Sequence, residues 1–185
     1  TKLGSTLLQK TLMFDLYANR MRAPHTAHED DYFVLKTSDW TNIIPLTDDG
    51  HVILVTQFRH GVEQDSLEIP GGIIDAEETD PQSAAIRELR EETGYTAREV
   101  RPLGAMHPNP ALQNNRCHSY LALGATLSGD QQLDSEEIIN VHRIPLAEIP
   151  ELIRSGKITH ANILTTFLLF LLQHGRELGC ERWMK

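Results

Sequence analysis

Two apolar stretches rich in β-branched residues are separated by a short polar turn. Residues 40–46 read WTNIIPL, residues 51–58 read HVILVTQF, and the turn between them contains Asp49-Gly50. An Asp-Gly step between two such runs is a strong signal for a β-hairpin. Similar patterns predict three more strands, at residues 97–106, 117–123 and 138–144. We therefore expect a β-sheet that uses segments from much of the chain.

Helices are predicted between and after these strands. One follows Asp80, a short one covers residues 146–155, and a longer one covers residues 162–178. Helices on both sides of a mixed sheet make an α/β (α+β) fold, so we expect an α/β/α sandwich around a mixed β-sheet. The apolar run ILTTFLLFLL at 163–172 is about half the length of a membrane span. It is predicted to be a buried amphipathic helix, and no membrane partner is expected.

The N-terminal segment allows two interpretations. Its alternating and aromatic residues predict one strand near 11–18 and another near 31–35, while the leucines of 7–18 also nearly fit a helical period. Two or three strands bury too little surface to be stable alone. We therefore divide the chain into an extension, residues 1–40, that packs on the main body or mediates dimerisation, and a main domain, residues 41–185.

One acidic stretch, residues 68–95, is the centre of the predicted site. It starts with EIPGG, continues through an acidic loop and then has the composition of a helix. Asp80 is placed to be the N-cap, with Pro81 at the first helical position, and Gly94 suits the left-handed residue that ends a helix. The stretch is therefore predicted to fold as a turn, a loop and a helix.

Three glutamates share one face of this predicted helix. Glu88, Glu91 and Glu92 stand three and four residues apart, so their carboxylates lie within one turn and repel one another. A hard divalent cation with oxygen ligands, Mg²⁺ above all, removes such repulsion. The alternative is a solvated acidic helix end, because glutamate-rich turns are common on protein surfaces. The three glutamates by themselves leave both interpretations open.

A longer pattern surrounds these glutamates. From Gly72 the chain reads Gly, five residues, Glu78, eight residues and then RELREETGY, which starts at Arg87. This string closely resembles the signature of the Nudix hydrolases, a loop-helix-loop motif that holds metal. The chain has one extra residue between Glu78 and Arg87, which we expect in the loop around Asp80. Glu77 could therefore take the place of Glu78.

The resemblance implies a Nudix fold from about residue 41 onward and a set of metal ligands. Glu88 and Glu92 match the positions that bind metal directly in the family, often together with the backbone carbonyl at the residue matching Gly71. Glu91 is implied as a further ligand, either direct or through water. The implied cofactor is Mg²⁺, with Mn²⁺ as a substitute.

The resemblance also implies an orienting residue and a general base. Arg87 lies one turn before Glu91, where an ion pair would orient that carboxylate, and its family counterpart also reaches the loop glutamate. Family members that cleave nucleoside diphosphate sugars place a base in a late loop just before a strand. Here the loop DSEE, which starts at Asp134, occupies that place, which favours Glu137 as the base and leaves Glu136 as the alternative. A merely solvated loop is the other interpretation.

Two further features resemble the branch of the family that acts on ADP-ribose and related nucleoside diphosphate sugars. One is the string QFR ending at Arg59 followed by EIPGG starting at Glu68, and the other is the proline-containing segment at 107–110. Arg59 is suited to bidentate phosphate contact, Glu68 could accept hydrogen bonds from ribose or base, and Trp40 could stack on a nucleobase. Members of this branch often form a swapped homodimer through an N-terminal extension, so we expect a homodimer.

The implied function is Mg²⁺-dependent hydrolysis of the diphosphate bond of a nucleoside diphosphate sugar such as ADP-ribose, giving a nucleoside monophosphate and a sugar phosphate. The alternative is a Nudix pyrophosphohydrolase that acts on nucleoside triphosphates, dinucleoside polyphosphates or RNA 5′ ends. A binding module without catalysis is disfavoured, because it has no need of three repelling carboxylates.

Composition narrows these expectations. The chain has 185 residues and a formal net charge of −9, which disfavours nucleic acid and anionic membranes as partners. Its 2 cysteines are too few for a disulfide framework, so a cytoplasmic location is predicted. A metal site at His107, Cys117 and His118 matches no zinc spacing. Four scattered histidines are predicted to be structural: His51, His60, His142 and His160.

Overall fold

A mixed β-sheet forms the centre of the main domain in the computed structural model, which describes residues 1–135, 137–180 and 183. The sheet is 7-stranded, in the order β12-β5-β4-β10-β9, with β6 paired to β5 and β7 paired to β4. β10 runs parallel to β4, and the other pairs are antiparallel. The bounds are β4 Trp40–Leu46, β5 His51–Arg59, β6 Gln64–Glu68, β7 Gly71–Ile73, β9 Glu99–Met106, β10 Cys117–Leu123 and β12 Ile139–Pro145, and a small sheet pairs β8 Tyr95–Thr96 with β11 Thr126–Leu127.

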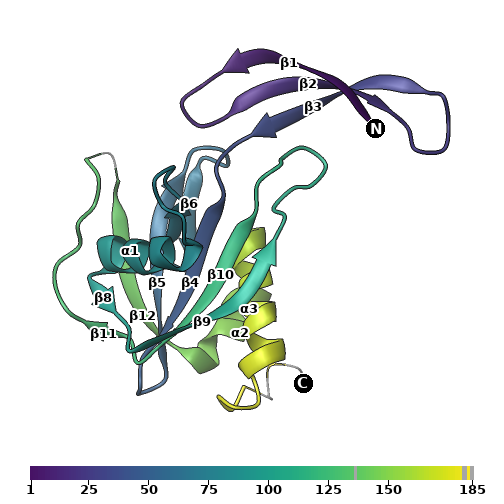
Figure 1. The fold of residues 1–185 in the computed structure, drawn as a ribbon. Coiled ribbons are helices and arrows are strands. Elements are labelled where there is room, and N and C mark those ends of the chain that lie inside the picture. The colour runs from purple at the N-terminus through teal and green to yellow at the C-terminus, as the bar shows by residue number, and fades with distance from the viewer. Residues whose placement is uncertain (136, 181–182, 184–185) are drawn as a thin grey trace.

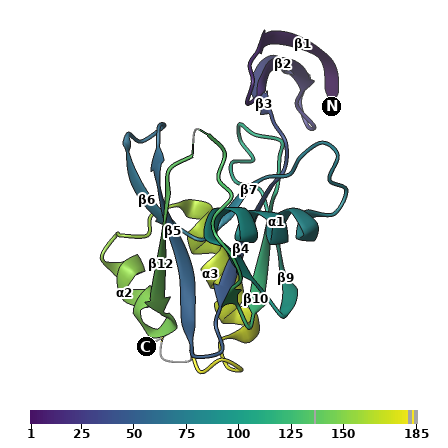
Figure 2. The same cartoon turned by 90° about the vertical axis from the view of Figure 1, so that its left-hand side faces the viewer.

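Helices cover both faces of this sheet, as Figures 1 and 2 show. Helix α1, Pro81–Thr93, lies on one face. Helices α2, Ile149–Arg154, and α3, Ala161–His174, pack on the other face, and the short 3-10 helix η1, Leu146–Glu148, leads into α2. Neighbouring side chains of β4 point to opposite faces of the sheet, because side chains alternate along a strand. Ile43 belongs to the core beneath α1, whereas Ile44 packs in the core with Phe167 and Phe170 of α3. The predicted α/β/α sandwich is confirmed.

The strands and helices predicted for the main domain are confirmed, with ends that differ by a few residues. The predicted 117–123 strand and the 40–58 hairpin are confirmed, with Gly50 at φ 79° in the turn. The last helix is shorter than predicted, because α3 ends at His174 and the chain turns at the buried Gly175. Within the described ranges, we find no helix with the length and apolar character needed to cross a membrane.

Helix α1 has both predicted caps. The side chain of Asp80 accepts hydrogen bonds from the backbone N–H groups of Gln82 and Ser83, both at 3.2 Å. Gly94 ends the helix at φ 73° and donates its N–H to the carbonyl of Arg90. A Cβ at Gly94 would overlap the carbonyl of Gly129, so glycine is required both by the conformation and by the close approach. The helix that carries Glu88, Glu91 and Glu92 is therefore set by local sequence.

The N-terminal segment forms a separate 3-stranded antiparallel sheet in the order β1-β2-β3. Its strands are β1 Lys2–Lys10, β2 Asp15–Arg22 and β3 Glu29–Lys36. The strand predicted near 11–18 begins too early, because a tight turn at residues 11–14 precedes β2, and the same turn makes the helical alternative at 7–18 wrong. The hydroxyl of Thr11 accepts hydrogen bonds from the N–H groups of Met13 and Phe14, and so holds this turn. The prediction at 31–35 lies within β3.

This small sheet stands away from the main domain (Figures 1 and 2). Every residue of β1 is exposed. The attachment runs through the end of β3, where Leu35 N–H donates to the Leu112 carbonyl at 2.8 Å and Thr37 N–H donates to Asn114 Oδ1 at 3.1 Å. The extension therefore leaves most of its own surface without contacts in a single chain.

Candidate active site

A pair of glycines brings the turn before α1 against the main sheet and the helix. Gly71 and Gly72 pair with Asn42 and Thr41 of β4. A Cβ at Gly71 would overlap the Thr41 carbonyl, and a Cβ at Gly72 would overlap the carboxylate of Glu88. The string EIPGG therefore needs its two glycines so that the turn can touch both β4 and α1.

Two glutamates of α1 place their carboxylates at this turn: Glu92 is buried, and the side chain of Glu88 is 12% exposed. Glu92 is 3% exposed and accepts a hydrogen bond from the N–H of Gly71 at 2.9 Å. Glu88 accepts from Arg87 Nη1 at 2.9 Å. Burial raises the pKa of Glu92 to about 8, against the opposing Gly71 hydrogen bond, and burial raises the pKa of Glu88 to about 7, against the opposing charge of Arg87. In the metal-free protein the ionised form of both carboxyl groups is therefore disfavoured, because the surroundings compensate its negative charge only in part.

Arg87 connects the loop and the helix. Its Nε and Nη2 donate to the two carboxylate oxygens of Glu78, each at 3.0 Å, and its Nη1 donates to Glu91 at 2.8 Å. The predicted contacts of Arg87 with Glu91 and with the loop glutamate are confirmed. Glu77 is exposed, and Glu78 is the loop glutamate that Arg87 contacts.

The donor set fits a hard divalent cation. Carboxylate oxygens are the ligands that such cations prefer, and Glu88 and Glu92 are ionised only at a cost in a buried environment without a counter-ion. Glu91 is turned toward Arg87. Among the residues that the structure describes, no three His, Cys, Asp or Glu side chains are gathered closely enough to hold an ion by themselves. Glu88 and Glu92 would therefore need a further oxygen, and the main-chain carbonyl of Gly71 is the neighbouring candidate.

The raised pKa values predict how the stability of the metal-free protein depends on pH. Both values, about 7 for Glu88 and about 8 for Glu92, lie above the ordinary 4.5. The folded protein therefore binds more protons than the unfolded chain between about pH 4.5 and about pH 8, and its free energy of unfolding should fall as the pH rises through this window. In EDTA, we expect the melting temperature to drop by about 5 °C or more between about pH 5.5 and about pH 8.5.

The Glu92→Gln variant separates this effect from other titrations. The glutamine side chain cannot ionise, so the melting temperature of this variant should fall less over the same pH range. The exposed pair on α2 provides the control, because Glu151→Gln should follow the wild-type curve. Equal declines in wild-type protein and Glu92→Gln would show that Glu92 has an ordinary pKa.

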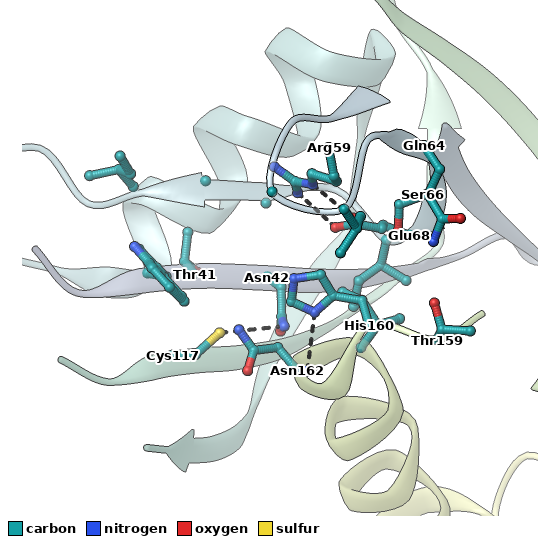
Figure 3. Close-up of a pocket in the computed structure, with 18 of the residues that line it drawn as sticks. Thr41, Asn42, Arg59, Gln64, Ser66, Glu68, Cys117, Thr159, His160 and Asn162 are labelled. Atoms are coloured by element: carbon teal, nitrogen blue, oxygen red, sulfur yellow. Dashed lines mark hydrogen bonds and ion pairs between the residues drawn. The ribbon is translucent and has the colours of Figure 1, made fainter. Parts of the chain in front are cut away.

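A cavity of about 510 Å³ lies beside this turn. It is bounded by β4, β6, the β5–β6 turn and the start of α3, and Figure 3 shows its lining residues. The three residues predicted to bind substrate all line it: Trp40, Arg59 and Glu68. Gly71 and Gly72 line it as well, so the cavity adjoins the part of the turn that contacts Glu88 and Glu92.

Arg59 and Glu68 do not act as separate contacts in the structure. Arg59 Nε and Nη2 donate to the two oxygens of Glu68 at 2.8 and 2.7 Å, across the β5–β6 hairpin. Burial opposes the charge of Glu68, but the hydrogen bonds from Arg59 outweigh it and lower the pKa of this carboxylate. The pair holds the guanidinium in a fixed orientation, and neither bond uses Nη1.

The loop before β12 lies beside the carboxylate end of α1. Gln132 N–H donates to the Glu91 carbonyl at 2.8 Å, and Gln131 Nε2 donates to the Glu92 carbonyl at 2.6 Å. The negative charge of Glu137 contributes to the raised pKa values of Glu88 and Glu92. Glu137 is therefore close enough for its charge to act on Glu88 and Glu92. Glu136, the alternative base, lies outside the described residues.

Several cavity residues were not predicted to be functional. Met13 comes from the β1–β2 turn, Cys117 from β10, and Thr159, His160 and Asn162 from the start of α3. The interpretation of His160 as merely structural is incomplete. These residues are far apart in sequence, and no local pattern marks them, except that His160 precedes a helical run at the N-cap position. Burial raises the pKa of the Cys117 thiol to about 12, so this residue serves as part of an inert wall.

Fold and site together define a class of protein: an α/β/α sandwich in which one helix brings buried carboxylates to the edge of a small-molecule cavity. The sequence profile of the NUDIX domain matches residues 39–167. The chain therefore belongs to the Nudix family of hydrolases.

Relatives agree with this membership. The ADP-ribose pyrophosphatase of Bacillus subtilis is 30% identical over 171 residues, which cover 92% of this chain and 90% of the relative. A CMP-5'-(N-acetyl-N-hydroxy-3-aminopropyl)phosphonate hydrolase of Streptomyces rubellomurinus is 39% identical over 117 residues, which cover 62% of this chain and 55% of that protein. The crystal structure of an ADP compounds hydrolase superposes with a TM-score of 0.84 at 22% identity and covers 96% of this chain and 95% of its own, which shows a common fold.

Proposed function

We propose that this Nudix hydrolase cleaves the diphosphate bond of a nucleoside diphosphate sugar such as ADP-ribose and releases a nucleoside monophosphate and a sugar phosphate. The observation that carries the proposal is the shared Gly71-Gly72 turn, which lines the 510 Å³ cavity on one side and contacts Glu88 and Glu92 on the other. A ligand in the cavity can thus place its phosphates at the carboxylates. The similarity to the ADP-ribose pyrophosphatase of B. subtilis supports this substrate class.

Each site residue has a task in this proposal. Arg59, fixed by Glu68, would contact a phosphate oxygen, and a guanidinium is the side chain best suited to that contact. Trp40 would stack on the nucleobase. Glu137, in the loop beside α1, would take the proton of the attacking water as general base. Arg87 would hold Glu78 and Glu91 in place.

A divalent ion would be held by Glu88, Glu92 and the Gly71 carbonyl, with Glu91 as a further or water-mediated ligand. Nudix hydrolases generally use divalent metal ions, and we infer Mg²⁺ here, with Mn²⁺ as a substitute. When bound, such an ion neutralises the charge of the diphosphate and stabilises the leaving phosphate.

A substrate panel tests the proposal. The protein would be incubated with Mg²⁺, or with Mn²⁺ in a parallel series, and with ADP-ribose, GDP-mannose, UDP-glucose, dinucleoside polyphosphates, nucleoside triphosphates and triphosphorylated RNA. Release of AMP and ribose 5-phosphate from ADP-ribose, with little attack on the triphosphates, is the expected result. Preferential turnover of triphosphates, dinucleoside polyphosphates or RNA would overturn it. The CMP conjugate hydrolysed by the Streptomyces relative is a reason to include several bases.

The proposal includes a homodimer formed through the N-terminal sheet. A 3-stranded sheet with one fully exposed strand buries too little surface to be stable by itself. Large apolar side chains are exposed on it: Leu3, Leu7, Leu8, Tyr32 and Phe33. A second copy of the chain would cover them. A cytoplasmic location remains a prediction from the cysteine content.

Charged substitutions test the dimer. Leu7→Asp and Phe33→Asp should convert a dimer into a monomer in light scattering, because each places a charge in the interface, and activity should fall with it. Leu172→Asp is the matched control, because Leu172 is 69% exposed on α3, away from this sheet. A wild-type monomer, or dimers that survive both substitutions, would contradict the proposed interface.

A further inference from the structure

The cavity has two chemically different ends. Ile73 and Cys117 flank Trp40 in register across β7, β4 and β10, so their side chains share one face of the sheet. These three residues make one end apolar or aromatic. At the other end, Gln64, Ser66 and Glu68 alternate along β6 and lie near the start of α3, as Figure 3 shows.

His160 completes the polar end. It is the N-cap of α3, and its Nδ1 accepts a hydrogen bond from the N–H of Asn162 at 3.2 Å. A ring nitrogen that accepts a hydrogen bond carries no proton, so in the neutral ring the proton is on Nε2. Figure 3 shows the ring reaching from α3 into the cavity on the side of Glu68. The geometry therefore offers one N–H donor to a ligand.

The N-cap task alone does not explain a histidine at this position. Asn, Asp and Ser cap helices better, and an imidazole gives no advantage in stability there. The residue is also held firmly, because the buried Ile158 anchors the chain on one side and α3 follows on the other. Glu68, which is 2% exposed, lines the same cavity as His160. A rigid donor beside a buried acceptor is suited to a ligand hydroxyl, which both donates and accepts.

We propose that His160 and Glu68 form the subsite for the sugar of the nucleotide sugar, with His160 Nε2–H donating to a sugar hydroxyl and Glu68 accepting from one. Ser66 and Gln64 add hydroxyl and amide groups to the same end. The nucleobase then occupies the end with Trp40, and the phosphates lie between the two ends, beside Arg59 and the Gly71-Gly72 turn. The inference rests on the proposed function, and it makes His160 a specificity residue.

Two substitutions of His160 separate its two tasks. His160→Asn keeps an N-cap acceptor for Asn162 N–H but is too short to place a donor where Nε2 lies. His160→Gln keeps a long side chain with an N–H donor but caps poorly. We expect His160→Asn to weaken ribose 5-phosphate binding and to raise KM for ADP-ribose about 3- to 10-fold, the scale of one lost hydrogen bond, with kcat nearly unchanged. Its melting temperature should not fall, whereas that of His160→Gln should.

The measurement is competitive inhibition by the two products, together with calorimetric binding of each. AMP and ribose 5-phosphate are used separately on wild type, His160→Asn, His160→Gln and a control, His51→Asn, whose residue lies at the start of β5 outside the cavity. The expected pattern is weaker ribose 5-phosphate binding in His160→Asn, partial recovery in His160→Gln, and unchanged AMP binding in all variants.

Three outcomes would overturn the subsite. The first is equal affinity for ribose 5-phosphate in wild type and His160→Asn. The second is a loss of AMP affinity in place of ribose 5-phosphate affinity. The third is a loss of ribose 5-phosphate affinity that is larger in whichever of the two His160 variants has the lower melting temperature. If wild type hydrolyses no nucleotide sugar and binds neither product, the proposed function fails and the subsite fails with it. If wild type hydrolyses ADP-ribose while His160→Asn behaves as wild type, only the subsite fails.

Discussion

The Glu92→Gln enzyme should lose about a thousandfold in kcat/KM, which corresponds to about 4 kcal/mol of transition-state stabilisation. Glutamine fills the same volume and can still accept the Gly71 N–H hydrogen bond, which is 2.9 Å long in the wild-type protein. The substitution therefore removes a charged oxygen ligand with little change in packing. Metal affinity should fall in parallel, and the measurements are steady-state turnover of ADP-ribose and calorimetric titration with Mg²⁺.

Matched variants make the Glu92 result interpretable. Glu88→Gln should give a similar loss, because Glu88 is the other carboxylate at the turn, where it lies against Gly72. Glu151→Gln on α2 removes the same charge from an exposed surface and should leave turnover unchanged. Melting curves in EDTA show whether each variant is folded. Full activity and normal Mg²⁺ affinity in both Glu88→Gln and Glu92→Gln would mean that α1 does not hold the metal.

The Glu137→Gln enzyme should lose about a hundredfold or more in kcat while it still binds metal, the usual scale for a general base. Glutamine cannot take up a proton at neutral pH, but it can still accept the N–H hydrogen bond of Asp134, which is 3.1 Å long. The fold of the loop should therefore persist. Turnover measured across pH, with Mg²⁺ affinity measured alongside, separates loss of a base from loss of metal.

Glu136→Gln is the necessary companion to this experiment, because the neighbouring glutamate is the alternative base. A large loss in kcat for Glu136→Gln and a small one for Glu137→Gln would exchange their roles. Near-normal turnover in both variants would place the base elsewhere. Glu137→Gln should also let Glu88 and Glu92 ionise more easily, because it removes one of the charges that raise their pKa values.

Local sequence was sufficient wherever the governing interactions are local. The N-cap at Asp80 and the left-handed Gly94 depend on atoms within a few residues, so α1 was predicted at both ends. The hairpin through Asp49-Gly50 follows from the same kind of local rule. The contact between Arg87 and Glu78 was implied by the resemblance to the Nudix signature, and it forms despite the inserted residue.

The N-terminal segment shows where local pattern fails. Its leucines nearly fit a helix, yet they lie on exposed strands. The turn between β1 and β2 depends on one hydroxyl, that of Thr11, and on pairing with strands that come later. The spacing of apolar residues predicts secondary structure reliably only when the same chain provides the surface that buries their side chains. Here the apolar side chains have no such surface within the described residues.

The sequence by itself determined the glutamates on α1, the glycine turn that touches them, and hence the family to which the chain belongs. The tertiary structure determined which residues line the cavity. It joined Arg59 to Glu68 across a hairpin, and it brought His160 from the start of α3 to the side of β6. Those contacts join segments that are far apart along the chain, and only the packing of the sheet against its helices sets their distances. The acidic helix therefore identifies the chemistry, and the walls of the cavity, built from distant segments, select the substrate.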